Sequence, residues 1–470
     1  MRGSRARSVL VAISAVIMCL GGVHPAAGAA TATPGHALWA KRYNGPGNGD
    51  DVGHAVVVSP DASAVFVTGS AVGATSLDYV TVAYSASTGA KLWLSRYDGP
   101  ANDVDFANAI AVSPDGTTVF VIGASPGSGS DDDYATVAYA AGTGAQLWAK
   151  RYNGPGNGDD EASDVGLSPD GATVFVTGSS AGTASDHDYA TVAYAASTGE
   201  RLWAKRYNGP GNGFDVAHAL VVSPDGATVF VTGSSDGSNP GGDYATLAYA
   251  AATGARQWVK RYDGPAHDVD YGYALAPSPD GSTLFVTGYS SASNSADFVT
   301  FAYAASTGAR LWVQRYDGPG HFFDFTRGLG VSPDGSTVFV TGQSFGSLSD
   351  SDYATVAYDA STGAQLWLKR YDGPAGCCDA PRDLGVSPDG SAVFVTGASP
   401  GPGSGYDYAT VAYAASTGAR MWLRRYDGPV NRFDAAEALA VSPNGSAVFV
   451  TGESHGSPSY DYATVAYSLT

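Results

Sequence analysis

Eight tryptophans recur along this chain at a spacing that hardly varies. Consecutive tryptophans are 54 or 55 residues apart throughout. A period of this length, held along a whole chain, is typical of a repeat protein, in which one small unit cannot bury its apolar face alone and packs against its neighbours. The eight are Trp39, Trp93, Trp148, Trp203, Trp258, Trp312, Trp367 and Trp422. A residue present in every unit is most simply explained as scaffold rather than as chemistry.

One unit, residues 215–262, shows what is repeated. Four short runs rich in β-branched and aromatic residues follow one another: AHALVVS at 217–223, TVFVT at 228–232, YATLAY at 244–249 and QWVKRY at 257–262. Turn formers such as Pro224-Asp225-Gly226 and Thr253-Gly254 separate them. These patterns predict four antiparallel β-strands per unit, which is the content of one propeller blade.

The segment Ala83 to Trp93 (AYSASTGAKLW) and its later copies resemble the tryptophan-docking repeat of propellers of the pyrroloquinoline quinone (PQQ) type. The longer unit, with its RYDGP, SPDG, VFVTG and DYATVAY segments, is similar to the bacterial "seven-bladed" β-propeller repeat family. This resemblance spans the mature chain and implies the fold, but little about activity. Because the repeats number eight here, we predict an all-β, eight-bladed propeller with four antiparallel strands per blade.

The order of the strands predicts how the ring closes. The first Trp strand, residues 38–43, comes before any inner strand, and the chain ends on a third strand, residues 462–467. We therefore expect the N-terminal strand to complete the last blade as its outer strand, which leaves no open side between the first and last blades.

The N-terminus has the features of a secretory signal peptide. Basic residues precede an apolar run from Val9 to Leu20, and Ala27-Gly28-Ala29 is a small-residue cleavage signal. We expect residues 1–29 to be removed and residues 30–470 to form one secreted propeller domain. No later segment approaches the roughly 20 apolar residues of a membrane span. The formal net charge of −19, without a basic cluster, argues against nucleic acid as a partner, and we expect a monomer.

Arginine and aspartate recur in every unit, which leaves two interpretations open. In the first, they form a clasp within each blade, with arginine bound to carboxylate and aspartate accepting backbone N–H groups at the loop ends. In the second, a ring of carboxylates binds cations such as calcium near the axis. The aspartates that end the loops before the inner strands are Asp51, Asp105, Asp160, Asp215, Asp270, Asp324, Asp379 and Asp434.

One position near the start of the inner strand varies more than the rest of the repeat. Three residues after each loop aspartate the chain carries His54, Asn108, Ser163, His218, Tyr273, Arg327, Arg382 and Glu437. Inner strands line the central channel of a propeller, and ligands commonly bind where loops and inner strands converge. The variation therefore predicts a site at the channel mouth, although drift in a water-filled channel stays an alternative.

Aromatic residues that the repeat does not explain gather in two units. They include Tyr271, Tyr273, Tyr289, Phe322, Phe323 and Phe325. The propeller prediction places them on one face of adjacent blades 5 and 6. Aromatic faces beside charged groups suit the rings of sugars and equally suit a protein loop, although the same aromatics could simply pack the loops.

The adjacent Cys377 and Cys378 are a disulfide candidate. In PQQ alcohol dehydrogenases, which the resemblance includes, a vicinal disulfide stacks on the cofactor. By that resemblance Arg327 and Arg382 would meet a quinone carboxylate, and the loop aspartates would supply calcium ligands. Against PQQ, the repeat uses all eight tryptophans, the loops are nearly minimal, and no C-x-x-C-H motif occurs.

The sequence thus favours a secreted binding scaffold with a carbohydrate or protein ligand at one face of the channel. Two enzyme classes remain as alternatives: a calcium-dependent PQQ dehydrogenase, and an extracellular polysaccharide hydrolase or lyase. No motif assigns a catalytic residue, and the balance of the sequence is against an enzyme.

Overall fold

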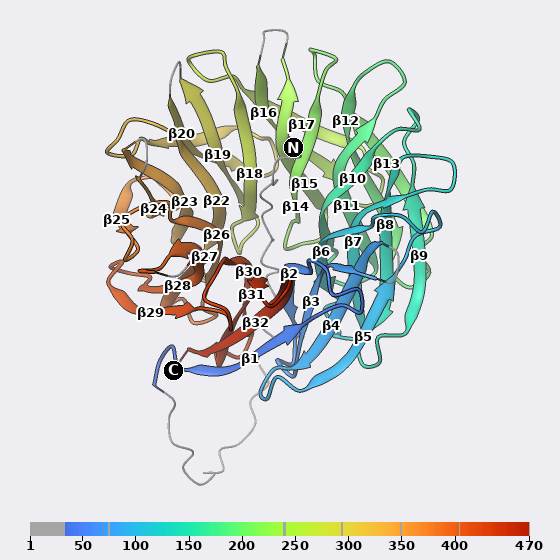
Figure 1. The fold of residues 1–470 in the computed structure, drawn as a ribbon. Helices are drawn as coiled ribbons and strands as arrows, with labels where there is room; N and C mark the ends of the chain where they lie inside the picture. Colours follow the sequence, from blue (N-terminus) through green and yellow to red (C-terminus); the bar gives the residue numbers. More distant parts are fainter. Residues whose placement is uncertain are drawn as a thin grey trace, which may run out of the picture.

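The computed structural model describes residues 33–73, 76–237, 241–292, 295–347, 350–403 and 405–469. In this part of the chain 32 β-strands form eight antiparallel sheets of four strands, arranged as a ring (Figure 1). The predicted eight-bladed, all-β propeller is therefore confirmed. No helix here is long and apolar enough to cross a membrane. The predicted signal peptide, residues 1–29, lies outside the described residues.

Each blade contains an inner, a second, a third and an outer strand. The inner strands are β2 (Val52–Val58), β6 (Phe106–Val112), β10 (Asp160–Leu167), β14 (Asp215–Val222), β18 (Asp270–Pro277), β22 (Asp324–Val331), β26 (Ala380–Val386) and β30 (Asp434–Val441). The second strands are β3 (Ala64–Val72), β7 (Thr118–Pro126), β11 (Thr173–Ala181), β15 (Thr228–Asp236), β19 (Thr283–Ala292), β23 (Thr337–Ser347), β27 (Ala392–Pro400) and β31 (Ala447–His455).

The two remaining strands lie toward the outside of the ring. The third strands are β4 (Leu77–Ser85), β8 (Asp132–Ala140), β12 (His187–Ala195), β16 (Gly242–Ala250), β20 (Ser295–Ala304), β24 (Asp350–Asp359), β28 (Tyr406–Ala414) and β32 (Tyr460–Ser468). The outer strands are β5 (Lys91–Tyr97), β9 (Gln146–Tyr152), β13 (Arg201–Tyr207), β17 (Arg256–Tyr262), β21 (Arg310–Tyr316), β25 (Gln365–Tyr371), β29 (Arg420–Tyr426) and, for the last blade, β1 (Ala37–Tyr43).

The hydrophobic core lies between blades. Each inner strand packs against the inner strands of both neighbouring blades, and β30 packs against β2 to close the ring. Each core cluster combines apolar side chains of two consecutive blades; one contains Phe175 and Trp203 of blade 3 together with Leu220 and Val231 of blade 4. A single blade has no core of its own, as expected for a repeat protein.

The repeated tryptophan joins each blade to the next. Trp203, for example, is buried, and its indole Nε1–H donates to the carbonyl of Ala251 in the following blade at 2.8 Å. The Thr-Gly turn of that blade lies flat on the indole, since a Cβ at Gly254 would come within 2.8 Å of the ring. Seven of the eight tryptophans make this hydrogen bond, at 2.7–2.9 Å.

The two chain ends rebuild the same turn without a covalent connection. Strand β1 pairs with β32, as predicted, and Figure 1 shows them side by side. Gly35 N–H donates to the Ser468 carbonyl at 2.8 Å, which matches the bond from Gly89 to Ser85 in the continuous turn of blade 1. Gly35 also takes the docking position against Trp422. Arg424 secures this split turn by donating to the carbonyls of Gly35 (2.6 Å) and Pro34 (3.2 Å).

The clasp interpretation of arginine and aspartate is confirmed. In all eight blades the outer-strand arginine pairs with the aspartate near the start of the third strand; Arg261 and Asp243 are 2.6 Å apart. Arg261 also donates to the Tyr207 hydroxyl of the preceding blade at 3.0 Å. The clasp thus fixes the outer strand and contributes to the blade junction.

Two inner strands carry a buried carboxylate that the sequence analysis did not single out. Asp164 accepts hydrogen bonds from the backbone N–H of Val165 and, in the next blade, of Leu220. Asp383 binds Leu384 and Leu439 in the same way. These bonds tie blade 3 to blade 4 and blade 7 to blade 8. Burial raises the pKa of each carboxyl from 3.8 to about 7, although the N–H donors act in the opposite direction.

We predict that replacing Arg424 by serine, the residue at the equivalent Ser95 of blade 1, destabilises the protein by about 1 to 2 kcal/mol. The reason is the loss of two charge-assisted hydrogen bonds that hold an unlinked turn. Lys205→Ser is the matched control, because the turn beside Lys205 is covalently continuous. Equal losses of stability in the two variants, measured by denaturant unfolding, would show that Arg424 has no special part in closing the ring.

We also predict that stability falls between about pH 4 and pH 7. The folded state holds the protons of Asp164 and Asp383 more tightly than the unfolded chain does, so their contribution is complete below pH 4 and is lost as the pH rises to 7. A pKa shift of about three units corresponds to on the order of 4 kcal/mol for each group. The double variant Asp164→Ala/Asp383→Ala should flatten this dependence in denaturant unfolding.

Alanine already stands at this position in blades 1, 2, 4, 5 and 8 (Ala55, Ala109, Ala219, Ala274 and Ala438), so the double variant respects the fold. Asp225→Ala, in an exposed turn where hydrogen bonds lower the aspartate pKa, is the control that should not flatten the curve. An unchanged slope in the double variant would contradict the assignment.

Candidate ligand-binding site at the channel mouth

A β-bulge occurs at the same place in every inner strand, and it coincides with the variable position. The pairing of β14 with β15 shifts between Ala217 and Ala219, which leaves His218 as the extra residue, and the other seven blades show the same shift. A bulge re-aims the side chain of its extra residue. The repeat therefore holds one position per blade out of the regular ladder, and that position carries the sequence differences between blades.

The bulge residues of blades 4, 5 and 6 contact one another, and those of blades 7 and 8 form a separate pair. The rings of His218 and Tyr273 stack at 5.3 Å between centroids, and the Arg327 guanidinium lies 5.3 Å above the Tyr273 ring. Arg382 and Glu437 form a loose ion pair with 3.7 Å between Nε and Oε1. Burial lowers the pKa of Arg327; the Tyr273 hydroxyl raises it and the charge of Arg382 lowers it further. These contacts bring the predicted residues into one arc.

The predicted aromatic residues extend this arc along blades 5 and 6. Tyr271 and Tyr289 are 5.2 Å apart, Tyr289 meets Phe325 edge-on at 4.9 Å, and Phe325 stacks with Phe323 at 5.8 Å. Tyr273 lies 5.9 Å from Tyr289 and so connects this row to the bulge residues. Phe323 is 42% exposed. The result is a continuous aromatic surface that runs from the channel mouth to the outer loops.

Three predicted residues differ from this pattern. Asn108 is buried and donates to the Ala162 carbonyl at 2.6 Å, so its side chain joins blades 2 and 3. Phe322 is partly buried, and its carbonyl accepts a hydrogen bond from Ala296. His54 is partly buried on blade 1, away from the aromatic row on blades 5 and 6.

The structure adds Glu453 to the site. Glu453 lies on β31, and burial and the neighbouring Glu437 raise its pKa from 4.5 to about 7, while Arg382 acts in the opposite direction. Glu453 directly follows a Val-Thr-Gly segment, and the residue that follows the same segment in blade 5 is Tyr289. A comparison of this second variable position across all blades would have found Glu453. The position is identifiable because its residue pairs across the strands with the residue two places before the bulge.

The predicted loop aspartates mainly stabilise their own loops. Asp215, for instance, is buried and accepts a hydrogen bond from Gly209 N–H at 2.7 Å, and burial raises its pKa to about 6. Each of the eight accepts the equivalent amide bond. This agrees with the loop-end part of the clasp interpretation.

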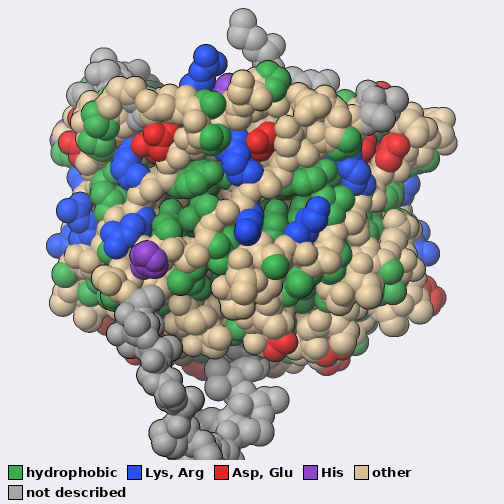
Figure 2. Space-filling view, turned by 60° about the horizontal axis from the view of Figure 1, so that its bottom comes forward, with side chains coloured by type: hydrophobic (Ala, Val, Ile, Leu, Met, Phe, Trp, Pro, Cys, Tyr) green, Lys and Arg blue, Asp and Glu red, His purple; other side chains and the backbone are tan. Residues whose placement is uncertain are grey.

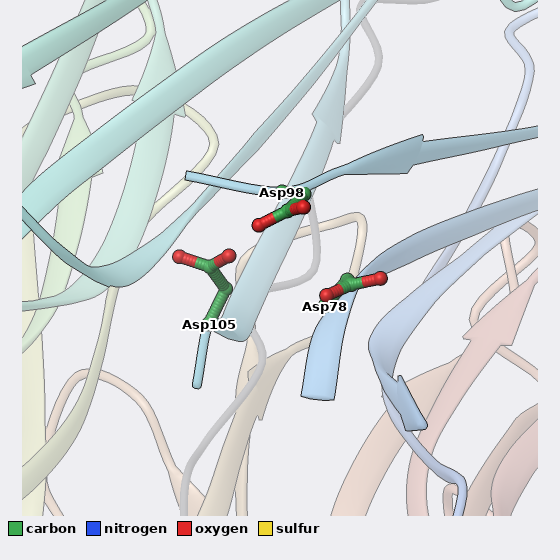
Figure 3. Close-up of side chains that lie close together, drawn as sticks. All are labelled: Asp78, Asp98 and Asp105. Carbon is green, nitrogen blue, oxygen red and sulfur yellow. The ribbon is translucent and has the colours of Figure 1, made fainter. Parts of the chain in front are cut away.

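Four of these aspartates also belong to acidic triads at blade junctions. Figure 3 shows Asp78, Asp98 and Asp105, whose carboxylate oxygens lie within 4.8 Å of one another. The equivalent triads end in Asp270, Asp324 and Asp434, and a fifth cluster joins Asp350, Asp352 and Asp372. Such oxygens could hold a divalent cation, but Arg96 already neutralises Asp78. Calcium binding therefore stays a prediction, located at separate junctions rather than in one ring.

The disulfide between Cys377 and Cys378 stays a prediction. Both residues lie in the loop before β26. A hydrogen bond with Cys378 raises the pKa of Cys377, and Cys378 has a left-handed backbone with φ of 64°.

The tryptophans are not placed as a PQQ site requires. All eight tryptophans are buried at blade junctions, 6–9% exposed, so none faces the channel mouth. No wall of tryptophan is available to a planar cofactor there, in agreement with the sequence analysis.

The outer surface carries a second set of exposed apolar side chains. They precede the docking tryptophan and are 41–55% exposed: Leu38, Leu92, Leu147, Leu202, Leu311, Leu366 and Met421. Figure 2 shows apolar and basic side chains interspersed over the outside of the ring. Since this set repeats from blade to blade, it does not distinguish one side of the ring, unlike the channel mouth.

Comparison with solved structures shows the same fold in proteins of different roles. Sqt1 from Chaetomium thermophilum, bound to the N-terminus of ribosomal protein L10, has a TM-score of 0.60 at 14% identity, covering 89% of this chain and 97% of that one. BamB from Moraxella catarrhalis gives 0.51 at 15% identity (92% and 99%). The quinohemoprotein alcohol dehydrogenase of Comamonas testosteroni gives 0.56 at 12% (92% and 76%). At these identities the likeness concerns the fold alone.

No curated protein is significantly similar to the chain in sequence. A family model described as outer membrane protein assembly factor BamB matches residues 21–239, 133–292 and 296–457, and so extends over most of the chain. The blade structure, the tryptophan docking and this match agree: the chain belongs to the PQQ-like β-propeller family of which BamB is the named representative.

Proposed function

We propose that this protein is an exported binding scaffold that captures a ligand at the channel mouth, on the arc formed by blades 4 to 8. One observation carries the proposal. The bulge leaves one residue per blade outside the regular strand pairing, and in blades 4 to 8 this residue is aromatic or charged. Residues that only fill a channel do not need to stack, whereas His218 and Arg327 both stack on Tyr273.

A carbohydrate is the ligand that this surface favours. Aromatic faces such as Tyr273 and Phe323 can stack on sugar rings, and Arg382 and Glu437 on blades 7 and 8 offer donors and acceptors for hydroxyl groups. A protein segment is the alternative, supported by Sqt1, a propeller of similar fold whose solved structure contains the N-terminus of a partner protein.

We predict that Tyr273→Ser weakens ligand binding at least tenfold, because it removes the ring on which both His218 and Arg327 stack. Serine is the bulge residue of blade 3 (Ser163) and fits the strand. Binding is measured with the mature protein, residues 30–470, on a glycan array and in pull-downs of extracellular protein. The control is Phe214→Ser, an exposed aromatic residue (51%) that stacks on His187 outside the arc.

Two results would defeat the proposal. One is the absence of any glycan or protein ligand for the wild-type protein. The other is an equal effect of Tyr273→Ser and Phe214→Ser, which would mean that the arc is not the site.

Acid–base cleavage of a polysaccharide is a second candidate. The observation that favours it is the proximity of Glu437 and Glu453, with the pKa of Glu453 at about 7, where a carboxyl can donate a proton. If a bound polysaccharide is shortened by the wild-type protein, Glu453→Gln should abolish cleavage and leave binding intact. Loss of both together would point to a binding role for Glu453.

Export makes a separate prediction. Processing near Ala30 leaves Thr33 to Gly35 intact, and these residues are needed because they bind Ser468 and Arg424. Intact-mass analysis of protein secreted by a bacterial host should therefore give an N-terminus between residues 28 and 33 by the cleavage signal. An N-terminus at Met1 in the secreted protein would contradict the signal-peptide assignment.

A further inference from the structure

The eighth blade junction differs from the other seven. Trp422 is only 6% exposed, yet among the described residues its Nε1–H has no hydrogen-bond acceptor. At the other junctions the acceptor is the carbonyl of the residue that follows the third strand, such as Ala415 for Trp367 at 2.8 Å. The residue in that place in the last blade is Leu469, next to the chain end. A buried donor left without an acceptor costs free energy and marks a place where a ligand can supply one.

Blades 7 and 8, which meet at this junction, are also farther apart than blades 6 and 7 at the turns between their inner and second strands. In the turn between the inner and second strands, a Cβ at Gly390 would lie 3.3 Å from Pro333 of the preceding blade. At the equivalent Gly445 no atom of the described residues lies within 4 Å. A cavity of about 460 Å³ occupies the space, with Trp422, Phe394, Met421 and Leu469 among its lining residues.

The cavity lining is mixed, with more apolar than polar surface. Pro388 and Pro443 complete the apolar wall, and Asp389 and Asn444 lie at its polar side. Asn444 is the one amide in a turn position that carries aspartate in the seven other blades. The Asp389 carboxylate is already engaged by Ser387 and by the N–H and hydroxyl of Ser391. The Trp422 indole therefore remains the donor without an acceptor in the cavity wall.

We propose that this cavity is a binding site for a peptide segment with small apolar side chains, which adopts the strand-to-turn conformation of the intact junctions and accepts the Trp422 Nε1–H at a backbone carbonyl. The seven intact junctions define the chemistry, since each presents the same donor to the backbone carbonyl of an alanine. At the split turn, no carbonyl of the described residues accepts the Trp422 Nε1–H. The site is independent of the channel mouth, because it lies between blades 7 and 8 at the opposite ends of the inner strands.

The test uses the mature protein labelled with ¹⁵N at the tryptophan indoles. Seven indole N–H signals should be protected from hydrogen exchange and one should not, and Trp422→Phe should delete the unprotected signal. Addition of Ac-Tyr-Ala-Ala-Ser-NH₂, the segment 413–416 that docks on Trp367, should shift the Trp422 signal and slow its exchange at least tenfold. Ac-Tyr-Glu-Glu-Ser-NH₂, which would have to bury negative charge beside Asp389, should leave the signal unchanged.

Binding of the fluorescein-labelled alanine peptide, followed by anisotropy, should be lost in Trp422→Phe and kept in Trp203→Phe, the same change at an intact junction. Trp203→Phe should lower the melting temperature more than Trp422→Phe, because only Trp203 loses a hydrogen bond. The proposal is overturned if all eight indoles are protected in the free protein, if neither peptide shifts Trp422, or if both peptides do so equally.

Discussion

The contact between a tryptophan of one blade and the Thr-Gly turn of the next is the interaction on which the rest of the structure depends. A four-stranded sheet of this size buries little by itself, and the core clusters all combine two blades. The indole supplies apolar area, and its N–H fixes the register through one carbonyl, as Trp203 does with Ala251. Because glycine is required where the turn meets the ring, the same few residues return in every unit.

Ring closure follows from that contact. The chain has no eighth covalent turn, so the last tryptophan docks on Gly35, from the opposite end of the sequence, and Arg424 holds that end through two backbone carbonyls. The noncovalent turn reproduces the strand pairing but not the indole hydrogen bond. The place where the ring is joined is therefore also the junction that retains an open donor and a cavity.

The β-bulge separates the scaffold from the site. Residues in the regular ladder of the inner strand pack against both neighbouring blades, so most of them are small or apolar; Asp164 and Asp383 are exceptions. The extra residue of the bulge escapes this restriction, so histidine, tyrosine, arginine and glutamate alternate there without a change of fold. Subtracting the repeat from the sequence consequently found most of the arc, including Tyr273, Arg327 and Arg382.

The periodic features were predictable because each is enforced eight times by the same packing. The features that the sequence did not predict depend on contacts that occur in only one or two blades. Asn108 looked like a channel residue, but its amide bonds to a neighbouring backbone. Glu453 was missed because the search for variable positions covered the inner strand, whereas Glu453 lies on the second strand. Asp164 and Asp383 were missed because their hydrogen-bond partners include backbone groups of another blade. The open indole of Trp422 lies where segments far apart in the sequence meet, and no local pattern records such a junction.

The division between scaffold and site can be measured by thermal unfolding of two triple variants. One replaces the bulge residues His218, Tyr273 and Arg327 with serine, and the other replaces the docking residues Trp148, Trp203 and Trp258 with phenylalanine. The bulge variant should melt within about 2 °C of the wild-type protein, whereas three lost indole hydrogen bonds, at about 1 kcal/mol each, should lower the melting temperature by several degrees. A bulge variant that melts as low as the tryptophan variant would contradict this account.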